Sequence, residues 1–236
     1  MNRFLIPALV LAVPALGLAA QDPFDYHCSD ITILQAKPVQ KELGINEGQR
    51  KQMNSAATKH QAVLNELDKQ YKGKQVSQQD MKKINPQLEK AFFALKKDVC
   101  AILSASQLKR LRELNLQRLG YAALNDSIVG AKIGMSPAQI KQYQAAFISG
   151  GQQAAKLQQD TAKPILEKFS KLKPKTEAEA NTLRTRAAEE IGQAQQKKAP
   201  QLKSIEMATQ KKMDAVLTAK QKAAWKALLG KPFKPA

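Results

Sequence analysis

The side chains best suited to metal or redox chemistry are few: two cysteines, Cys28 and Cys100, and two histidines, His27 and His60. A structural zinc site needs about four closely spaced Cys or His ligands. The sequence has neither a CxxC nor an HExxH pattern. A redox or metal site at His27 and Cys28 therefore remains a minor alternative, and His60 is expected to be a core or interhelix residue.

Motifs of the other catalytic classes are also missing from the sequence, which has no GxSxG, Walker-type glycine loop or DxDxDG. The carboxylate pairs Glu177/Glu179 and Glu189/Glu190 lie in polar helical sequence, as is typical of a solvated helix face. Gly150 and Gly151 indicate a flexible or closely packed point in a long helix. We therefore expect a protein that is not an enzyme, with no catalytic residue, cofactor or metal.

The first 20 residues combine a positive charge at Arg3, an apolar run and small residues before position 21. This pattern predicts a secretory signal peptide over 1–20. The alternative is a retained anchor, but the run is shorter than the roughly 20 residues that span a bilayer. Pro7 and Pro14 also interrupt it. We expect secretion across the inner membrane to the periplasm or the cell exterior, with no transmembrane segment after cleavage.

Export changes the interpretation of the two cysteines, because an oxidising compartment favours their pairing. We expect a disulfide between Cys28 and Cys100. In the chain-entropy model, closing a loop of this length stabilises the fold by roughly 4 kcal/mol. The bond would join an irregular N-terminal arm to the end of a helix.

Four similar five-residue motifs, which we call words, mark predicted helix starts. Each consists of an apolar residue, then Asn, Ser or Thr, then any two residues and finally Gln. In such a capping box the first polar side chain accepts from a backbone N–H, and the Gln side chain reaches back to the cap. The capping residues are Asn46, Gln49, Ser104, Gln107, Ser136, Gln139, Thr218 and Gln221. We expect replacement of a cap by Ala to cost about 0.5–2 kcal/mol, and replacement of a Gln to be milder.

Apolar residues between these words recur at alternating steps of three and four, which predicts long helices with one packed seam each. Ala, Gln, Lys and Leu dominate the composition, and all are good helix formers. The three clearest seams contain Leu64 and Leu67, Leu88 and Phe92, and Phe147 and Gly150. Pro200 is expected to kink or interrupt the last long helix. The fold class is therefore all-α.

The two halves of the sequence match each other. Six residues between Val39 and Gln49 match residues 90 positions later, and six between Leu103 and Leu114 match residues 114 positions later. The difference of 24 predicts a longer hairpin in the second half. We expect tandem long antiparallel hairpins with short flanking helices, in a first module over 21–125 and a second over 126–236.

The word Leu217–Gln221 resembles the LTxxQ motif of Spy/CpxP-like periplasmic proteins, which are small helical chaperones and envelope-stress or metal-resistance accessories. The segments 39–44, 116–124 and 225–233 look more specifically like uncharacterised exported bacterial proteins with paired LTxxQ words. The resemblance implies a duplicated Spy-like module. Spy-like proteins have one module and dimerise, whereas this chain carries two, so we expect a monomeric pseudo-dimer rather than a homodimer.

The chain is strongly basic, with 38 Lys and Arg against 20 Asp and Glu and a formal charge of +18. Residues 126–236 carry 20 basic and 9 acidic residues. The lysines of the candidate basic surface are Lys163, Lys168, Lys171, Lys173, Lys175, Lys197, Lys198, Lys211 and Lys212. Such a surface either keeps the protein soluble or attracts acidic partners. Export and the low aromatic content of 5% disfavour nucleic acid.

Two functions of different classes fit these features. The first is an ATP-independent chaperone or envelope-stress factor that binds unfolded or acidic clients on a basic helical surface. The second is a structural or adaptor protein of the envelope that binds a helical partner or an anionic surface. A metal-resistance accessory is less favoured, because the sequence has so few Cys and His residues.

Overall fold

The computed structural model describes residues 22–73 and 76–234, so the predicted signal peptide lies outside the described residues. The described part of the chain is helical and contains no strand, which confirms the predicted all-α class. It divides into two compact units, 22–112 and 113–234. The boundary between them falls inside helix α5 (Ala105–Leu119), earlier than the expected module boundary at 125/126.

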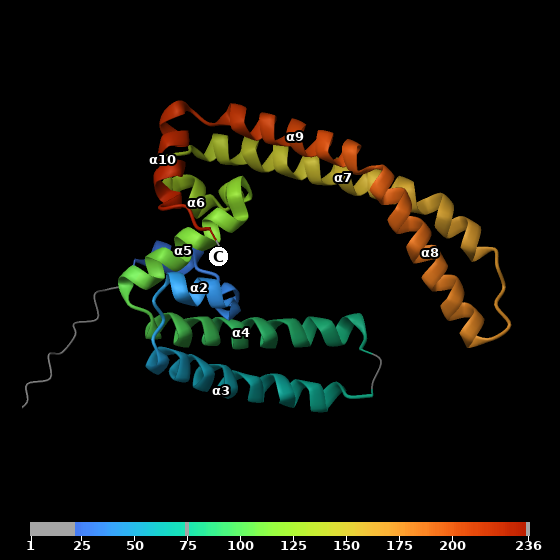
Figure 1. The fold of residues 1–236 in the computed structure, drawn as a ribbon, viewed down its shortest axis with the longest axis horizontal. Helices are drawn as coiled ribbons and strands as arrows, with labels where there is room; N and C mark the ends of the chain where they lie inside the picture. The colour runs from blue at the N-terminus through green and yellow to red at the C-terminus, as the bar shows by residue number, and fades with distance from the viewer. Residues whose placement is uncertain (1–21, 74–75, 235–236) are drawn as a thin grey trace, which may run out of the picture. The chain divides into compact units, whose positions relative to one another are not determined.

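The first unit contains three short helices and one long hairpin. The short helices are α1 (Pro23–Cys28), the 3-10 helix η1 (Ile31–Gln35) and α2 (Lys37–Glu42). The hairpin consists of α3 (Glu47–Tyr71) and α4 (Gln78–Ile102), which lie side by side (Figure 1). The unit closes with the first residues of α5.

The prediction of an irregular N-terminal arm is wrong, because this segment forms α1 and η1. The Asp22 side chain accepts from the Phe24 N–H at 2.8 Å, and Pro23 occupies the first helical position, where its missing N–H costs nothing. A buried ion pair holds α1 in the unit, since Arg112 Nε donates to Asp25 Oδ1 at 2.9 Å. At the end of α1, Lys96 Nζ donates to the His27 carbonyl at 3.1 Å.

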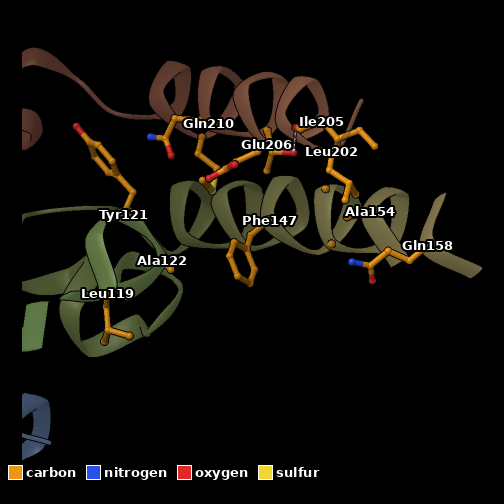
Figure 2. A pocket seen from close by; sticks show the side chains of 14 residues that line it. Leu119, Tyr121, Ala122, Phe147, Ala154, Gln158, Leu202, Ile205, Glu206 and Gln210 are labelled. Atoms are coloured by element: carbon orange, nitrogen blue, oxygen red, sulfur yellow. Dashed lines mark hydrogen bonds between the residues drawn. The ribbon is translucent and has the colours of Figure 1, made fainter. Parts of the chain in front are cut away.

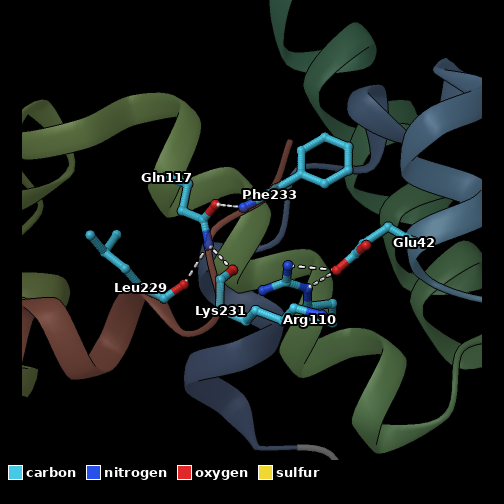
Figure 3. Close-up of polar contacts among 6 residues, drawn as sticks. All are labelled: Glu42, Arg110, Gln117, Leu229, Lys231 and Phe233. Atoms are coloured by element: carbon cyan, nitrogen blue, oxygen red, sulfur yellow. Dashed lines mark hydrogen bonds and ion pairs between the residues drawn. The ribbon is translucent and has the colours of Figure 1, made fainter. Parts of the chain in front are cut away.

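The core of the first unit lies at the closed end of its hairpin, where the short helices meet α5. Leu108 and Leu111 are fully buried there. On the surface of the same end, Arg110 forms hydrogen bonds from Nε and Nη2 to Glu42 Oε1 at 2.9 and 2.6 Å (Figure 3). The short helices and α5 thus fix the base from which α3 and α4 extend.

The second unit repeats this order with a longer hairpin. After the end of α5 come the 3-10 helix η2 (Gly120–Asn125), α6 (Ser127–Lys132), α7 (Pro137–Ser170), α8 (Glu177–Lys197), α9 (Ala199–Val216) and α10 (Ala219–Leu229). Figure 1 shows α7 running beside both α9 and α8. The expected interruption at Pro200 is confirmed, since the helix breaks at Lys198.

The side-chain amide of Gln117 holds the residues after α10 in place. Gln117 Nε2 donates to the carbonyls of Leu229 at 2.7 Å and Lys231 at 2.8 Å (Figure 3). Gln117 Oε1 accepts from the Phe233 N–H at 2.9 Å. Beside this segment, the rings of Tyr121 and Trp225 lie 6.1 Å apart. These contacts fix the C-terminal end of the described chain to the closed end of the second unit.

Helix boundaries in the two units recur at the offsets found in the sequence. The starts of α2 and α6, and those of α3 and α7, differ by 90 residues. The ends of α4 and α9, and the starts of α5 and α10, differ by 114. The added residues lie in the part of the second hairpin furthest from α10. We call residues 162–191, which replace residues 72–77 of the first unit, the extension.

Candidate functional site

All four Gln-containing words act as helix caps. The side chains of Asn46, Ser136 and Thr218 each accept from the backbone N–H three residues later, with the Gln side chain accepting from the cap in return. At the start of α5, the Gln107 N–H donates to Ser104 Oγ at 3.2 Å and the Ser104 N–H donates to Gln107 Oε1 at 2.9 Å. These words therefore start the four helices that meet at the two closed ends.

The Gln side chains also join the helices in pairs. In the first unit, Gln49 Nε2 donates to Gln107 Oε1 at 2.8 Å and to the Ile102 carbonyl at 3.0 Å. Gln107 Nε2 donates to Gln49 Oε1 at 3.1 Å and to the Leu43 carbonyl at 3.1 Å. We call Gln49 and Gln107 the first glutamine pair. Each amide binds its own cap, the other amide and a carbonyl at a helix end.

The second glutamine pair, Gln139 and Gln221, makes matching contacts. Gln139 Nε2 donates to Gln221 Oε1 at 3.0 Å and to the Val216 carbonyl at 2.9 Å. Gln221 Nε2 donates to Gln139 Oε1 at 2.9 Å and to the Gly134 carbonyl at 2.7 Å. Val216 is offset from Ile102 by 114 residues. Capping statistics alone predict none of these contacts between helices, so the sequence reasoning missed the main role of the Gln residues.

The candidate basic residues all lie in the second unit but do not form one cluster. Five are in the extension, two are at the break between α8 and α9, and Lys211 and Lys212 are exposed on α9. Lys168 Nζ pairs with Glu190 at 2.9 Å, and Lys163 approaches Glu167 at 4.0 Å. The strongest concentration of positive charge is therefore the turn of the extension.

The expected disulfide is not present in the structure. Cys28 and Cys100 are both buried thiols in the first unit, and no disulfide joins them. Burial raises the pKa of the Cys100 thiol to about 11, with Lys96 acting in the opposite direction. The expectation of a disulfide rests on composition and on predicted export alone, whereas the structure buries both cysteines without joining them.

His60 lies between α3 and α4, as expected from its place in the seam. It is 8% exposed, and its Nε2 lies 3.1 Å from Asp98 Oδ2. The hydrogen bonds from His60 and then from Lys59 lower the pKa of the Asp98 carboxyl. Among the described residues, no group of three or more His, Cys, Asp or Glu is placed to hold a metal ion. His60 therefore forms a structural contact between the two helices.

An apolar groove of about 500 Å³ lies in the second unit between α7, α9 and the segment 119–122. Its apolar walls include Leu119, Phe147, Leu202 and Met213. Figure 2 shows these walls coming from the two helices and from the end of α5 with η2. A volume of this size is typical of a ligand-binding cleft.

Small residues on α7 keep the groove open. Gly150 is buried, and a Cβ at this position would collide with the Thr209 side chain, so α7 and α9 pack closely there. This confirms the prediction of a closely packed point. One residue further, Gly151 faces open space, and Ala154 lines the groove one turn later. The polar side chains that line the groove are those of Tyr121, Gln158, Glu206, Thr209 and Gln210.

The corresponding positions of the first unit carry larger side chains. His60 lies 90 residues before Gly150, and Leu64 lies 90 residues before Ala154. On the opposite helix, Leu95 and Lys96 lie 114 residues before Thr209 and Gln210. The residues that open the groove are therefore specific to the second unit. Heptad spacing predicted only that Phe147, Gly150 and Ala154 share a seam.

The hairpin of the first unit exposes apolar side chains. Leu88 and Phe92, expected in the packed seam, are 37% and 41% exposed, and Phe93 is 59% exposed. Ile84 and Ala91 are buried in α4 instead. The seam prediction was wrong at these positions because each helix of a two-helix hairpin can bury only a narrow stripe against its neighbour.

No helix in the described residues is long and apolar enough to cross a membrane. The chain matches no protein-family model, no curated protein and no solved structure.

Proposed function

We propose that this protein is a non-enzymatic, ATP-independent chaperone that holds unfolded segments of client proteins, and that the groove between α7 and α9 is a client-binding site. The observation that carries the proposal is an open apolar groove in a chain of formal charge +18. Unfolded proteins expose apolar side chains, which such a groove can bury.

Two physical effects, burial of apolar surface and long-range electrostatic attraction, support binding without tight specificity. The walls contributed by Phe147, Leu202 and Met213 offer apolar surface, and each buried methylene group contributes about 0.8 kcal/mol. Exposed lysines on α9, such as Lys211 and Lys212, attract acidic clients at long range. Charge of this kind raises the association rate more than the affinity. We expect fast, salt-dependent capture followed by weak apolar contact.

The similarity between the units supports an origin by internal duplication. Helix starts at offsets of 90 and 114 residues, together with two glutamine pairs in matching contacts, favour one ancestral hairpin module. The LTxxQ-like words fit a Spy/CpxP-like relationship, and the N-terminal sequence fits export. We retain the expectation of a monomer, which light scattering on the protein lacking residues 1–20 tests directly.

The second candidate is an adaptor of the cell envelope whose groove receives a helix of one partner protein. The same apolar walls favour it, because amphipathic helices dock in apolar grooves. The two functions differ in selectivity. A chaperone protects unrelated unfolded proteins, whereas an adaptor binds one folded partner and protects none.

An aggregation-suppression assay separates the candidates. The protein is mixed at equimolar ratio with two unrelated reduced clients, such as α-lactalbumin and insulin, and light scattering is followed at low and high salt. We expect suppression of both clients, weaker at high salt. No suppression of either client at stoichiometric amounts would contradict the chaperone proposal.

Variants that fill the groove test whether the suppression of aggregation depends on this site. Gly151→Leu with Ala154→Leu adds side chains to open space on α7. Gly192→Leu is the matched control, because Gly192 also faces open space on a helix but lies outside the groove. We expect the double variant to lose most of the suppression and the control to keep it. Equal suppression by both would remove the groove from the proposal.

A further inference from the structure

The extension is the part of the second unit that the first unit lacks. It comprises the end of α7, the turn 171–176 and most of α8. Its buried apolar residues are only Ile165 and Ala187. Figure 1 shows the turn at the end of the hairpin opposite α10. The extension therefore adds little to the core and places its turn at the far end of the unit.

Three of the five lysines of the extension lie in the turn, and Glu177 and Glu179 follow it. Lys171, Lys173 and Lys175 are exposed, and within the described residues none of their ammonium groups has an acidic partner within ion-pair distance. Glu179 contacts the turn through its carboxylate, which accepts from the Lys175 backbone N–H at 2.7 Å and not from the lysine side chain. Lys168 is different, because it pairs with Glu190.

Apolar side chains stand among these lysines. Leu172 is 46% exposed between Lys171 and Lys173, and Leu166 is 53% exposed near the end of α7. Lysines around an exposed leucine are typical of segments that rest on a bilayer, because the leucine enters the interface while the lysine heads stay with the lipid headgroups.

We propose that the turn 171–176 of the extension docks on an anionic lipid bilayer. The turn ends the hairpin (Figure 1), and its three lysines fall within residues 171–175, so a broad anionic surface is a suitable partner. Anionic headgroups supply the complementary charge, and the exposed Leu172 supplies an apolar contact that a soluble polyanion would not use. The site is independent of the groove and adds membrane attachment to the proposed chaperone function.

Vesicle co-sedimentation of the protein lacking residues 1–20 tests this proposal, with phosphatidylcholine vesicles containing or lacking phosphatidylglycerol. We expect partitioning only onto the anionic vesicles. The Lys171→Gln, Lys173→Gln, Lys175→Gln triple variant should lower it about tenfold or more. Leu172→Ser, which keeps the charge, should lower it about threefold. Unchanged partitioning of Leu172→Ser, or none by the unmodified protein, would overturn the proposal.

The matched control removes the same charge elsewhere. Lys72, Lys82 and Lys83 are exposed near the turn of the first hairpin, and their replacement by Gln changes the net charge equally. We expect this variant to lose only about twofold, because it leaves the three lysines of the turn and Leu172 in place and weakens only the long-range attraction. Equal losses in the two triple variants would show attraction by net charge alone and would overturn the assignment to the extension.

Discussion

The two units have the same closed end but different hairpins. At each closed end, two capped helices meet and a glutamine pair joins them. In the first hairpin, His60 and Asp98 connect the two helices. At the corresponding positions the second hairpin has Gly150 and Lys212, and a groove opens nearby. The comparison teaches that the glutamine pairs fix the base of each unit, which leaves the hairpin free to vary.

The largest effect is expected from breaking a glutamine pair. Gln221 is 7% exposed, and its replacement by Ala leaves the Gly134 carbonyl and the Gln139 amide without this partner. The Gln221 side chain makes four hydrogen bonds, and each contributes about 0.5–1.5 kcal/mol, so we expect Gln221→Ala to lower the free energy of unfolding by about 2–4 kcal/mol. Urea denaturation measures the change.

The matched variant for this prediction is Thr218→Ala, which removes the cap but leaves the glutamine pair. We expect it to cost about 0.5–2 kcal/mol. The structure thus reverses the order predicted from sequence, in which the Gln changes were milder. A cost for Gln221→Ala below that of Thr218→Ala would contradict the role of the pair.

The next effect concerns the close approach of α7 and α9. Gly150→Leu places a side chain where Thr209 packs, and we expect a loss of about 1–3 kcal/mol from overpacking. The neighbouring Gly151→Leu enters open space and should gain about 0.5–1 kcal/mol from helix propensity. Thermal unfolding of both variants checks the contrast. Equal changes in melting temperature would mean that the two helices are not closely packed at Gly150.

A pH effect should distinguish the first hairpin. Hydrogen bonds from His60 and Lys59 lower the pKa of Asp98 below its ordinary value of 3.8. The pairing therefore stabilises the first unit above that value, and the contribution is lost as the pH falls through the lowered pKa. We expect Asp98→Asn to destabilise the protein near neutral pH and to have little effect at an acidic pH below the lowered pKa, where Asp98 is protonated. A destabilisation that is the same at both pH values would contradict the ion pair.

The smallest effect concerns thiol reactivity in the first unit, where Cys100 occupies the position that corresponds to Asp214. Burial raises the pKa of Cys100 to about 11, which leaves little reactive thiolate at pH 8. We expect slow alkylation of the folded protein and rapid alkylation of two thiols in denaturant without reductant. Failure to label either cysteine in denaturant would mean that a disulfide forms after all.

The fold class and the helix starts could be predicted because they depend on local chemistry. Capping residues such as Ser104 and Thr218 act on backbone groups a few residues away, so their words are readable in sequence. The break before Pro200 is predicted from the same kind of local chemistry, whereas α4 and α7 continue past Pro86 and Pro164, so a proline alone does not fix a helix end.

The groove and the glutamine pairs could not be predicted, because they depend on which residues of distant segments face each other. Gln49 and Gln107 are 58 residues apart, and no local pattern indicates their contact. Leu88 and Phe92 show the same limit, since heptad spacing cannot tell which flank of a helix its neighbour covers. Small residues at Gly151 and Ala154 give a groove only when the opposite helix is known.

The most direct test of the groove as a client-binding site is the affinity for an unfolded client. Fluorescence anisotropy with labelled, reduced and carboxymethylated α-lactalbumin gives the Kd for the unmodified protein, for Gly151→Leu with Ala154→Leu, and for Gly192→Leu. We predict that filling the groove weakens binding about tenfold, which corresponds to about 1.4 kcal/mol, while Gly192→Leu binds as the unmodified protein does. An unchanged Kd for the filled groove, with the helices intact by circular dichroism, would contradict the account.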